Sequence, residues 1–359
     1  MTGRKRWTTK TVRAGKREAQ RALASMIAEV DRGVPGTEAT LAVLLERWFE
    51  VASPDWAPGT VTQTRSAIRH HLGPRLGAVP LKRLRAADID SCYAAMRKLP
   101  GRKDRFMSPA AIRRVHVVLH AALAQAVKWG WIPVNPADAA SPPRVIQPDL
   151  APPPPEGVAR LLADVATDDP DLYVYLRLAV STGARRSQLC GLQWRDVDLS
   201  SGALTFARAV VDGPDGIVVK GTKTHRTYRV TVDGSTLAVL QAHHERMKER
   251  AEFCGVALRR DGYVFSHAPD AAAPWRPDVT SHRWRRARDR VGLEGVRLHD
   301  LRHFMATTML TAGVPVSVAG RLGHARAATT LNVYSHFVDT GDKVAADVLQ
   351  KIMEEVGAE

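Results

Sequence analysis

The sequence contains few cysteines, no long apolar run and few acidic residues for its length. Its three cysteines among 359 residues, Cys92, Cys190 and Cys254, are too few and too scattered for a disulfide framework or a four-cysteine zinc site. No apolar run reaches the roughly 18 residues that a membrane span needs, and no apolar region follows the basic N-terminus. These absences predict a cytoplasmic protein with reduced thiols, no signal peptide and no membrane span.

Basic side chains outnumber acidic ones. The 52 Lys and Arg residues against 37 Asp and Glu residues give a formal net charge of +15 at pH 7. Such a surplus is typical of proteins with a polyanionic partner, although an arginine-rich composition from a GC-rich genome would give the same count. A length of 359 residues predicts two or three domains.

Arginine, histidine and tyrosine side chains that could carry out catalysis lie in motifs near the C-terminus, and one further arginine lies far upstream. Arg185 ends the motif Thr182-Gly183-Ala184-Arg185, and downstream follow His299, Arg302, His324 in Leu322-Gly323-His324, and Tyr334. Guanidinium groups hold phosphate through paired hydrogen bonds, imidazoles transfer protons near neutral pH, and a phenol beside positive charge can act as a nucleophile. The set predicts phosphodiester cleavage with covalent attachment of the phenol, and therefore DNA strand exchange.

In their order and spacing these motifs resemble the tyrosine recombinase (phage integrase) family. His324 precedes Tyr334 by ten residues and Arg302 precedes it by 32, as in the family's second box. The resemblance implies a site-specific integrase that cuts and rejoins DNA through a 3′-phosphotyrosyl intermediate, without ATP, metal or another cofactor. Alternatives are a chromosome or plasmid resolvase, a transposon recombinase and a catalytically silent DNA-binding regulator.

The resemblance also assigns roles to individual residues. It implies this catalytic set: Arg185, Lys223, His299, Arg302, His324 and the nucleophile Tyr334. Lys223 lies in a hairpin connection and would protonate the departing 5′ oxygen, with Lys220 as its competitor.

Two residues depart from the family pattern, and one pair of histidines is similar to the zinc-protease pattern. Gln188 stands where the family usually has Glu, and Met305 stands where a small residue is commoner. His299 and His303 are four residues apart, as in zinc proteases, but that pattern needs Glu as the base where this chain has Asp300. A zinc hydrolase is therefore a remote alternative.

The expected fold is multidomain and mainly α. Residues 1–36 form a basic segment, either the remnant of an arm-DNA-binding module or only a solvated helix. Residues 37–140 resemble the helical, SAM-like core-binding domain, and the proline-rich residues 141–155 predict an extended linker. Residues 156–359 resemble the catalytic domain, a mixed α+β domain with a small antiparallel sheet.

Local patterns predict individual elements. In the helical domain, Thr40 is expected to cap a helix, another helix runs over 58–71, and Ser108-Pro109 begins a third with one buried stripe. Arg113, Arg114 and Lys128 fall off that stripe and are candidate DNA contacts, or a solvated face.

Further elements are expected at both ends of the chain. The catalytic domain should contain helices over 171–182 and 235–253 and one sheet with strands over 204–211, 216–222 and 228–232, with a turn at Asp212-Gly213. A strand over 7–12, a helix over 16–31 and an amphipathic helix over 344–356 complete the expectation.

The resemblance finally implies partners. These are double-stranded DNA at attachment or core sites and a homotetramer on two duplexes. A directionality factor or a host DNA-bending protein is a further candidate partner. The protein is expected to be encoded by a bacterium or phage and to act at the nucleoid, with no membrane partner.

Overall fold

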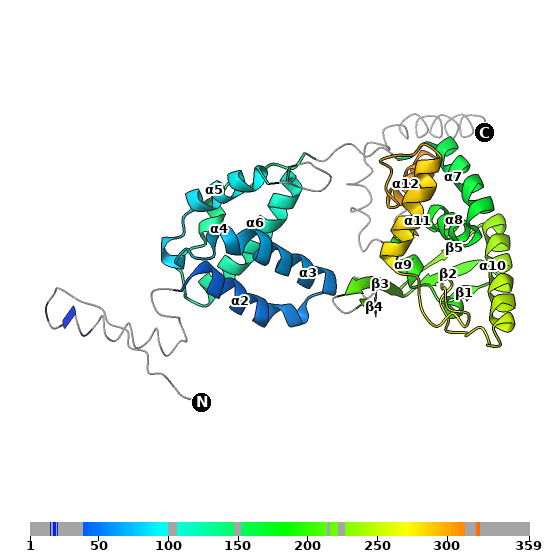
Figure 1. Ribbon diagram of the computed structural model, residues 1–359, viewed down its shortest axis with the longest axis horizontal. Coiled ribbons are helices and arrows are strands. Elements are labelled where there is room, and N and C mark those ends of the chain that lie inside the picture. The colour runs from blue at the N-terminus through cyan, green and yellow to red at the C-terminus, as the bar shows by residue number, and fades with distance from the viewer. Residues whose placement is uncertain are drawn as a thin grey trace, which may run out of the picture. The chain divides into compact units, whose positions relative to one another are not determined.

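The chain forms two compact units, Met1–Pro148 and Asp149–Glu359, each with its own hydrophobic core (Figure 1). The computed structural model describes residues 39–99, 106–146, 152–213, 216–221, 227–312 and 321–323, with Gly15, Arg17, Glu18 and Gln20. The strand predicted over 7–12, the helix over 344–356 and most of the helix over 16–31 lie outside these residues.

The described part of the N-terminal unit is helical. Its α-helices are α2 (Leu41–Ala52), α3 (Pro58–Ala67), α4 (Gly73–Leu76), α5 (Ala86–Arg97) and α6 (Pro109–Lys128). Short 3₁₀ turns lie at Ser53–Asp55, Leu81–Arg83 and Pro136–Ala139, and a π-helical turn follows α3 at Ile68–Leu72.

The longest helix of this unit forms for the reasons that its sequence suggests. Ser108 caps α6, because its hydroxyl accepts a hydrogen bond from the Ala111 N–H at 3.3 Å, and Pro109 occupies the first helical position. The predicted stripe is buried and packs against α2 and α3; its residues are Ile112, Val115, Leu119, Ala122 and Ala126. The helix start at Ser108-Pro109 and the buried stripe, both predicted from the sequence, are confirmed.

Two details of the helical unit differ from expectation. Thr40 precedes α2, but its side chain makes no capping hydrogen bond; instead Thr40 forms an isolated β-bridge with Pro80. The helix expected over 58–71 is α-helical only to Ala67 and continues as the π-helical turn Ile68–Leu72. Apolar periodicity does not distinguish these hydrogen-bonding patterns.

The C-terminal unit combines helices with two small sheets. Its helices are α7 (Pro155–Asp168), α8 (Pro170–Thr182), α9 (Arg186–Cys190), α10 (Gly234–Phe253), α11 (Pro277–Arg290) and α12 (Asp300–Thr311). Its strands are β1 (Val197–Asp198), β2 (Ala203–Phe206), β3 (Arg208–Gly213), β4 (Gly216–Gly221) and β5 (Tyr228–Thr231), with a 3₁₀ turn at Trp194–Asp196.

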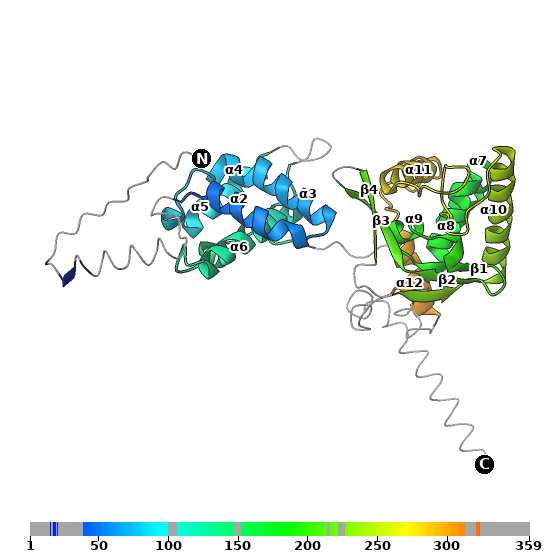
Figure 2. The same cartoon turned by 90° about the horizontal axis from the view of Figure 1, so that it is seen from below.

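Helix α8 is the centre of this unit, because it packs against α7, α9, α10 and α12. Tyr175 and Leu178 on α8 are fully buried in the core. The predicted helices over 171–182 and 235–253 correspond to α8 and α10 and are confirmed. Figures 1 and 2 show α10 running beside β1 and β2, while the β3–β4 hairpin projects from the body of the unit.

The prediction of one sheet was wrong. The strands form a three-stranded antiparallel sheet in the order β1-β2-β5 and a separate hairpin of β3 and β4. The strand expected over 204–211 is divided at Ala207, so that β2 pairs with β5 and β3 pairs with β4. Asp212 and Gly213 are not a turn but the last paired residues of β3, opposite Ile217 and Gly216.

Across the described ranges, none of the helices is both long and apolar enough to cross a membrane.

Candidate active site

The position of Arg185 is set by the end of α8. Gly183 terminates the helix with a φ of 62°, a left-handed conformation that favours glycine. The buried Thr182 hydroxyl donates to the Leu178 carbonyl at 2.6 Å and accepts from the Ala184 N–H at 3.1 Å, which fixes the turn. Arg185 therefore stands at the N-cap of α9 with its side chain exposed.

Arg302 lies in the first turn of α12 and is only 4% exposed. Its Nη1 donates to the Gly183 carbonyl at 2.6 Å and its Nη2 donates to the Leu322 carbonyl at 2.7 Å. These two bonds join the three motifs that the sequence places far apart. Arg321 ties the same segment to α8, because its Nη2 donates to the Ser181 carbonyl at 2.8 Å.

His299 immediately precedes α12, at its N-cap position. Burial among neighbouring atoms, and then the nearby charges of His303 and Arg302, lower its pKa to about 4. The ring is therefore neutral at neutral pH and can accept or donate a hydrogen bond. The helix start beside it is fixed by Asp300, whose carboxylate accepts from the Arg297 N–H at 2.7 Å.

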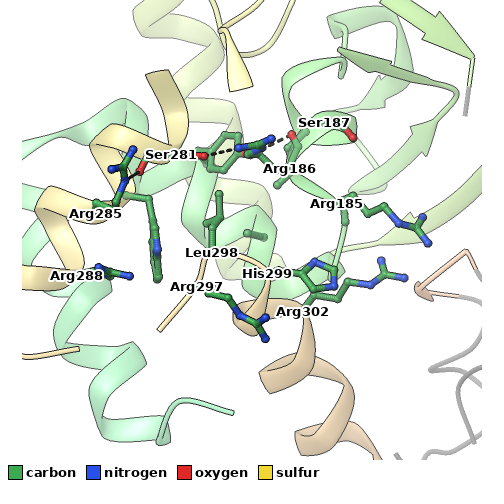
Figure 3. A pocket seen from close by; sticks show the side chains of 15 residues that line it. Arg185, Arg186, Ser187, Ser281, Arg285, Arg288, Arg297, Leu298, His299 and Arg302 are labelled. Carbon is green, nitrogen blue, oxygen red and sulfur yellow. Dashed lines mark hydrogen bonds between the residues drawn. The ribbon is translucent and has the colours of Figure 1, made fainter. Parts of the chain in front are cut away.

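Arg185, His299 and Arg302 line one cleft of about 470 Å³. In Figure 3 the guanidinium groups of Arg185 and Arg302 point in the same direction, with the His299 ring beside them. Four further arginines line the cleft: Arg186, Arg285, Arg288 and Arg297. The concentration of positive charge makes the cleft suited to a phosphate group.

The other arginines of the cleft have different partners. Arg297 pairs with Asp300 at 2.8 Å and Arg288 pairs with Asp289 at 2.8 Å, so carboxylates balance both charges. Arg186 turns toward α11, where its Nη1 donates to the Ser281 hydroxyl at 2.5 Å (Figure 3). No such carboxylate pairing is found for Arg185 within the described residues.

Gln188, the third residue of α9, is buried beneath the arginines. Its Oε1 accepts the backbone N–H of Arg185 at 3.0 Å, which is half of a capping box, and the hydroxyl of Tyr228 at 3.0 Å. Burial raises the pKa of Tyr228 above its ordinary value, while the charges of Arg302 and Arg185 act in the opposite direction. The Tyr228 hydroxyl is therefore protonated at neutral pH and serves as a donor.

Sequence reasoning did not identify Tyr228. Its ring stacks on Phe206 with centroids 5.1 Å apart, and a Cβ built on Gly323 would lie 2.7 Å from its ring. Tyr228 thus contacts the middle residue of the Leu322-Gly323-His324 motif. The only available signal was its place five residues after Lys223, which does not show which way the side chain points.

Three of the six expected catalytic residues, Lys223, His324 and Tyr334, lie outside the described residues. Lys220, the competitor of Lys223, lies on β4 opposite Ala209. The rings of His299 and His303 are 4.9 Å apart, yet in the described segments no group of three or more His, Cys, Asp or Glu residues is arranged to hold a metal ion.

The sequence profile of the phage integrase family matches residues 154–340, which is more than half of the chain. The chain belongs to this family. A second profile, the N-terminal SAM-like domain of phage integrases, matches residues 40–96. The arginine cleft thus lies in the integrase region, and helices α2, α3 and α5 lie largely in the SAM-like region.

Individual integrases are similar to the chain at low identity. The ICEBs1 integrase of Bacillus subtilis (strain 168) is 25% identical over 201 residues, covering 55% of this chain and 54% of that protein. The match therefore spans about half the length of that curated relative.

Two solved structures show the same fold. A Tn1549 transposon integrase in complex with circular intermediate DNA matches with a TM-score of 0.70 at 19% identity, covering 86% of this chain and 99% of that chain. A lambda integrase tetramer bound to a Holliday junction matches with a TM-score of 0.62 at 18% identity, covering 92% and 89%. The mainly α fold with small antiparallel strands, expected from the sequence, is confirmed.

Proposed function

We propose that this protein is a site-specific integrase of the tyrosine recombinase type, which cuts and rejoins DNA strands of a phage or another mobile element. The observation that supports this most directly is the convergence of Arg185, His299 and Arg302 in one cleft, although α8 and α12 are far apart in sequence. The family match supports the same reaction class.

In the proposed reaction Arg185 and Arg302 bind the non-bridging oxygens of the scissile phosphate. The phenol oxygen of Tyr334 attacks phosphorus, the bond from phosphorus to the 5′ oxygen breaks, and the phenol proton passes to a histidine base. Lys223 gives its proton to the departing 5′ oxygen. The phosphotyrosyl ester retains the bond energy, so the reverse step with a new 5′ hydroxyl needs neither ATP nor a metal.

His299 and His324 complete the proposed catalytic set as hydrogen-bond partners of the phosphate and as proton-transfer groups. The lowered pKa of His299 supports a neutral imidazole that can hydrogen-bond to the phosphate. The carbonyls of Gly183 and Leu322 orient Arg302, so the positively charged group is in place before DNA arrives.

We assign a separate function to each segment of the chain. Residues 37–140 bind core DNA, residues 141–155 link this domain to the catalytic domain at 156–359, and residues 1–36 are an additional basic segment. Four protomers would assemble on two duplexes in the nucleoid, with a directionality factor or a DNA-bending protein as a further partner. The lambda integrase tetramer on a Holliday junction supports this assembly.

The direct test of this function is a covalent adduct with DNA. Attachment-site DNA, taken from the repeats that flank the element, is nicked beside the cleavage site so that the cleaved strand diffuses away and the adduct accumulates. The adduct is expected on a denaturing gel without ATP or added metal, and it should disappear after protease treatment. Tight binding without any adduct would instead favour a silent DNA-binding regulator.

Helix α6 carries the proposed core-DNA contacts Arg113, Arg114 and Lys128, all of them exposed. Arg114 also lines a groove of about 670 Å³ between α3 and α6, together with Gln63 and Ser66. Amide and hydroxyl groups of this kind accompany basic residues at phosphate contacts.

We expect the triple substitution Arg113→Ala, Arg114→Ala and Lys128→Ala to weaken core-site binding and its salt dependence. Each phosphate that the variant no longer neutralises should reduce the slope of log affinity against log salt by about 0.9. Titrations at several salt concentrations measure it. The matched control is Arg97→Ala with Lys98→Ala at the end of α5, also exposed. An equal change in both variants would mean that α6 has no special role.

The basic N-terminal segment gives a separate prediction. Between Arg4 and Arg21 it has eight basic side chains and one acidic one, Glu18. If these side chains contact phosphates, removal of residues 1–36 should flatten the salt slope by several units, at about 0.9 per phosphate, without loss of covalent cleavage on a short core site. An unchanged slope on every DNA tested would identify the segment as merely solvated.

A further inference from the structure

The Tyr228 hydroxyl is hydrogen-bonded to Gln188 of the Arg185 motif and also to Arg302, and the proposed reaction uses both arginines. It donates to Gln188 Oε1 at 3.0 Å, and the same oxygen accepts the backbone N–H of Arg185 at 3.0 Å. Gln188 itself is 4% exposed, so neither donor is readily replaced by bulk water. Tyr228 begins β5, which makes this contact a link between the sheet and the N-cap of α9.

The ring of Tyr228 is fixed on two sides. It stacks on Phe206 of β2 at an interplanar angle of 26°, and it packs so closely over Gly323 that a Cβ there would lie 2.7 Å from two ring atoms. Gly323 has a φ of 59°, a left-handed conformation that favours glycine. The hydroxyl therefore has one well-defined position.

An amide at position 188 requires more orientation than a carboxylate. A carboxylate presents an acceptor oxygen toward the Arg185 N–H in either rotation of its end group, whereas an amide does so in only one. If the NH₂ group of Gln188 faced the Arg185 N–H, two hydrogen-bond donors would face each other and no bond would form. A second donor on Oε1 removes this ambiguity, and Tyr228 is that donor.

We propose that Tyr228 is a positioning residue, whose hydroxyl holds the Gln188 amide in the one orientation that fixes the backbone of Arg185 for phosphate binding. This inference rests on the proposed strand-cleavage function. Because Gln188 is neutral, it leaves the charges of Arg185 and Arg302 undiminished for the phosphate. Tyr228 supplies the orientation that a carboxylate would not need.

The test compares the natural chain with Tyr228→Phe, Gln188→Glu and the double variant. Single-turnover cleavage rates are measured on nicked attachment-site DNA at saturating protein, together with DNA affinity and melting temperature. Tyr228→Phe should slow cleavage on the order of 10-fold, with unchanged DNA affinity, because it removes the buried hydrogen bond to Gln188 together with the one to Arg302, and a small misplacement at a catalytic arginine is costly.

The decisive result is the effect of Tyr228→Phe when it is combined with Gln188→Glu. A carboxylate accepts the Arg185 N–H in any rotation, so we expect the penalty to fall below about 3-fold in that combination. The same penalty with either residue at position 188 would overturn the proposal, because the lost hydroxyl would then act through its other partner, Arg302. A natural rate for Tyr228→Phe would also overturn it.

The matched control is Tyr173→Phe, which removes a half-buried hydroxyl from α8 and should change neither rate nor affinity. Failure of the proposed function is a different result: the natural chain would then form no covalent adduct on any attachment site. An adduct formed equally fast by the natural chain and Tyr228→Phe would refute the positioning role alone.

Discussion

Replacement of Tyr334 by phenylalanine is expected to abolish covalent attachment to DNA and to leave DNA affinity nearly unchanged. Only the nucleophilic oxygen is lost, while Arg185 and Arg302 remain to bind the phosphate. The measurement uses DNA nicked beside the cleavage site, with the protein–DNA adduct resolved on a denaturing gel and affinity measured by titration. The effect should be the largest of any single substitution.

Tyr228 is an appropriate control, because its hydroxyl lies close to both arginines: it donates to Gln188 beside Arg185 and is hydrogen-bonded to Arg302. Its hydroxyl donates to Gln188, and burial raises its pKa, so it is a poor nucleophile. Tyr228→Phe should still form the adduct, although more slowly. An adduct that persists in Tyr334→Phe and disappears in Tyr228→Phe would transfer the nucleophilic role to Tyr228.

Local features of the fold could be predicted because their causes are local. The Ser108 cap, the first-turn proline and the buried stripe of α6 depend on residues within a few positions of one another. The sheet could not be predicted to the same degree. Whether the chain around Ala207 forms one strand or two depends on the partners β4 and β5, which are not encoded in strand propensity.

The candidate site was predictable only as a set of motifs. The hydrogen bond from Arg302 to Gly183 spans 119 residues, and no periodicity in the sequence predicts a contact at that separation. The resemblance to the integrase family grouped these residues by motif, and the cleft brings Arg185, His299 and Arg302 together in space. Tyr228 was missed because side-chain contacts across β5 and α9 have no local signature.

The two departures from the family pattern acquire a physical meaning in the structure. Met305 is 5% exposed and packs against Gly183, where an added Cβ would lie 2.1 Å from its Cε. The large Met305 side chain therefore fills the space that Gly183 leaves open. This space lies next to the Gly183 carbonyl, which accepts a hydrogen bond from Arg302. Gln188 keeps the acceptor function but not the charge, and its second donor is Tyr228.

The second large effect is expected for Arg302→Lys, which should reduce cleavage on the order of 10²-fold or more. Lysine keeps the positive charge but cannot donate in the planar, bidentate geometry of a guanidinium. It also cannot satisfy the Gly183 and Leu322 carbonyls together while reaching phosphate, so the melting temperature should fall as well. DNA affinity should change little, because many other contacts contribute to it.

The control for this substitution is Arg297→Lys in the same cleft. Arg297 is exposed and its charge is balanced by Asp300, and lysine keeps that charge, so the cleavage rate of Arg297→Lys should stay near natural. A second control uses DNA in which sulfur replaces the 5′ bridging oxygen, since a thiolate leaves without protonation.

The sulfur-containing substrate distinguishes the role of Arg302 from that of the general acid, Lys223. It should restore cleavage to a Lys223→Ala variant but not to Arg302→Lys, because the arginine stabilises charge on the non-bridging oxygens. Restoration of Arg302→Lys by the sulfur substrate would assign Arg302 to the protonation of the leaving group. A nearly natural rate on ordinary DNA, accompanied by a lower melting temperature, would mean that the two carbonyl contacts are its whole role and that Arg302 holds α12 against the end of α8.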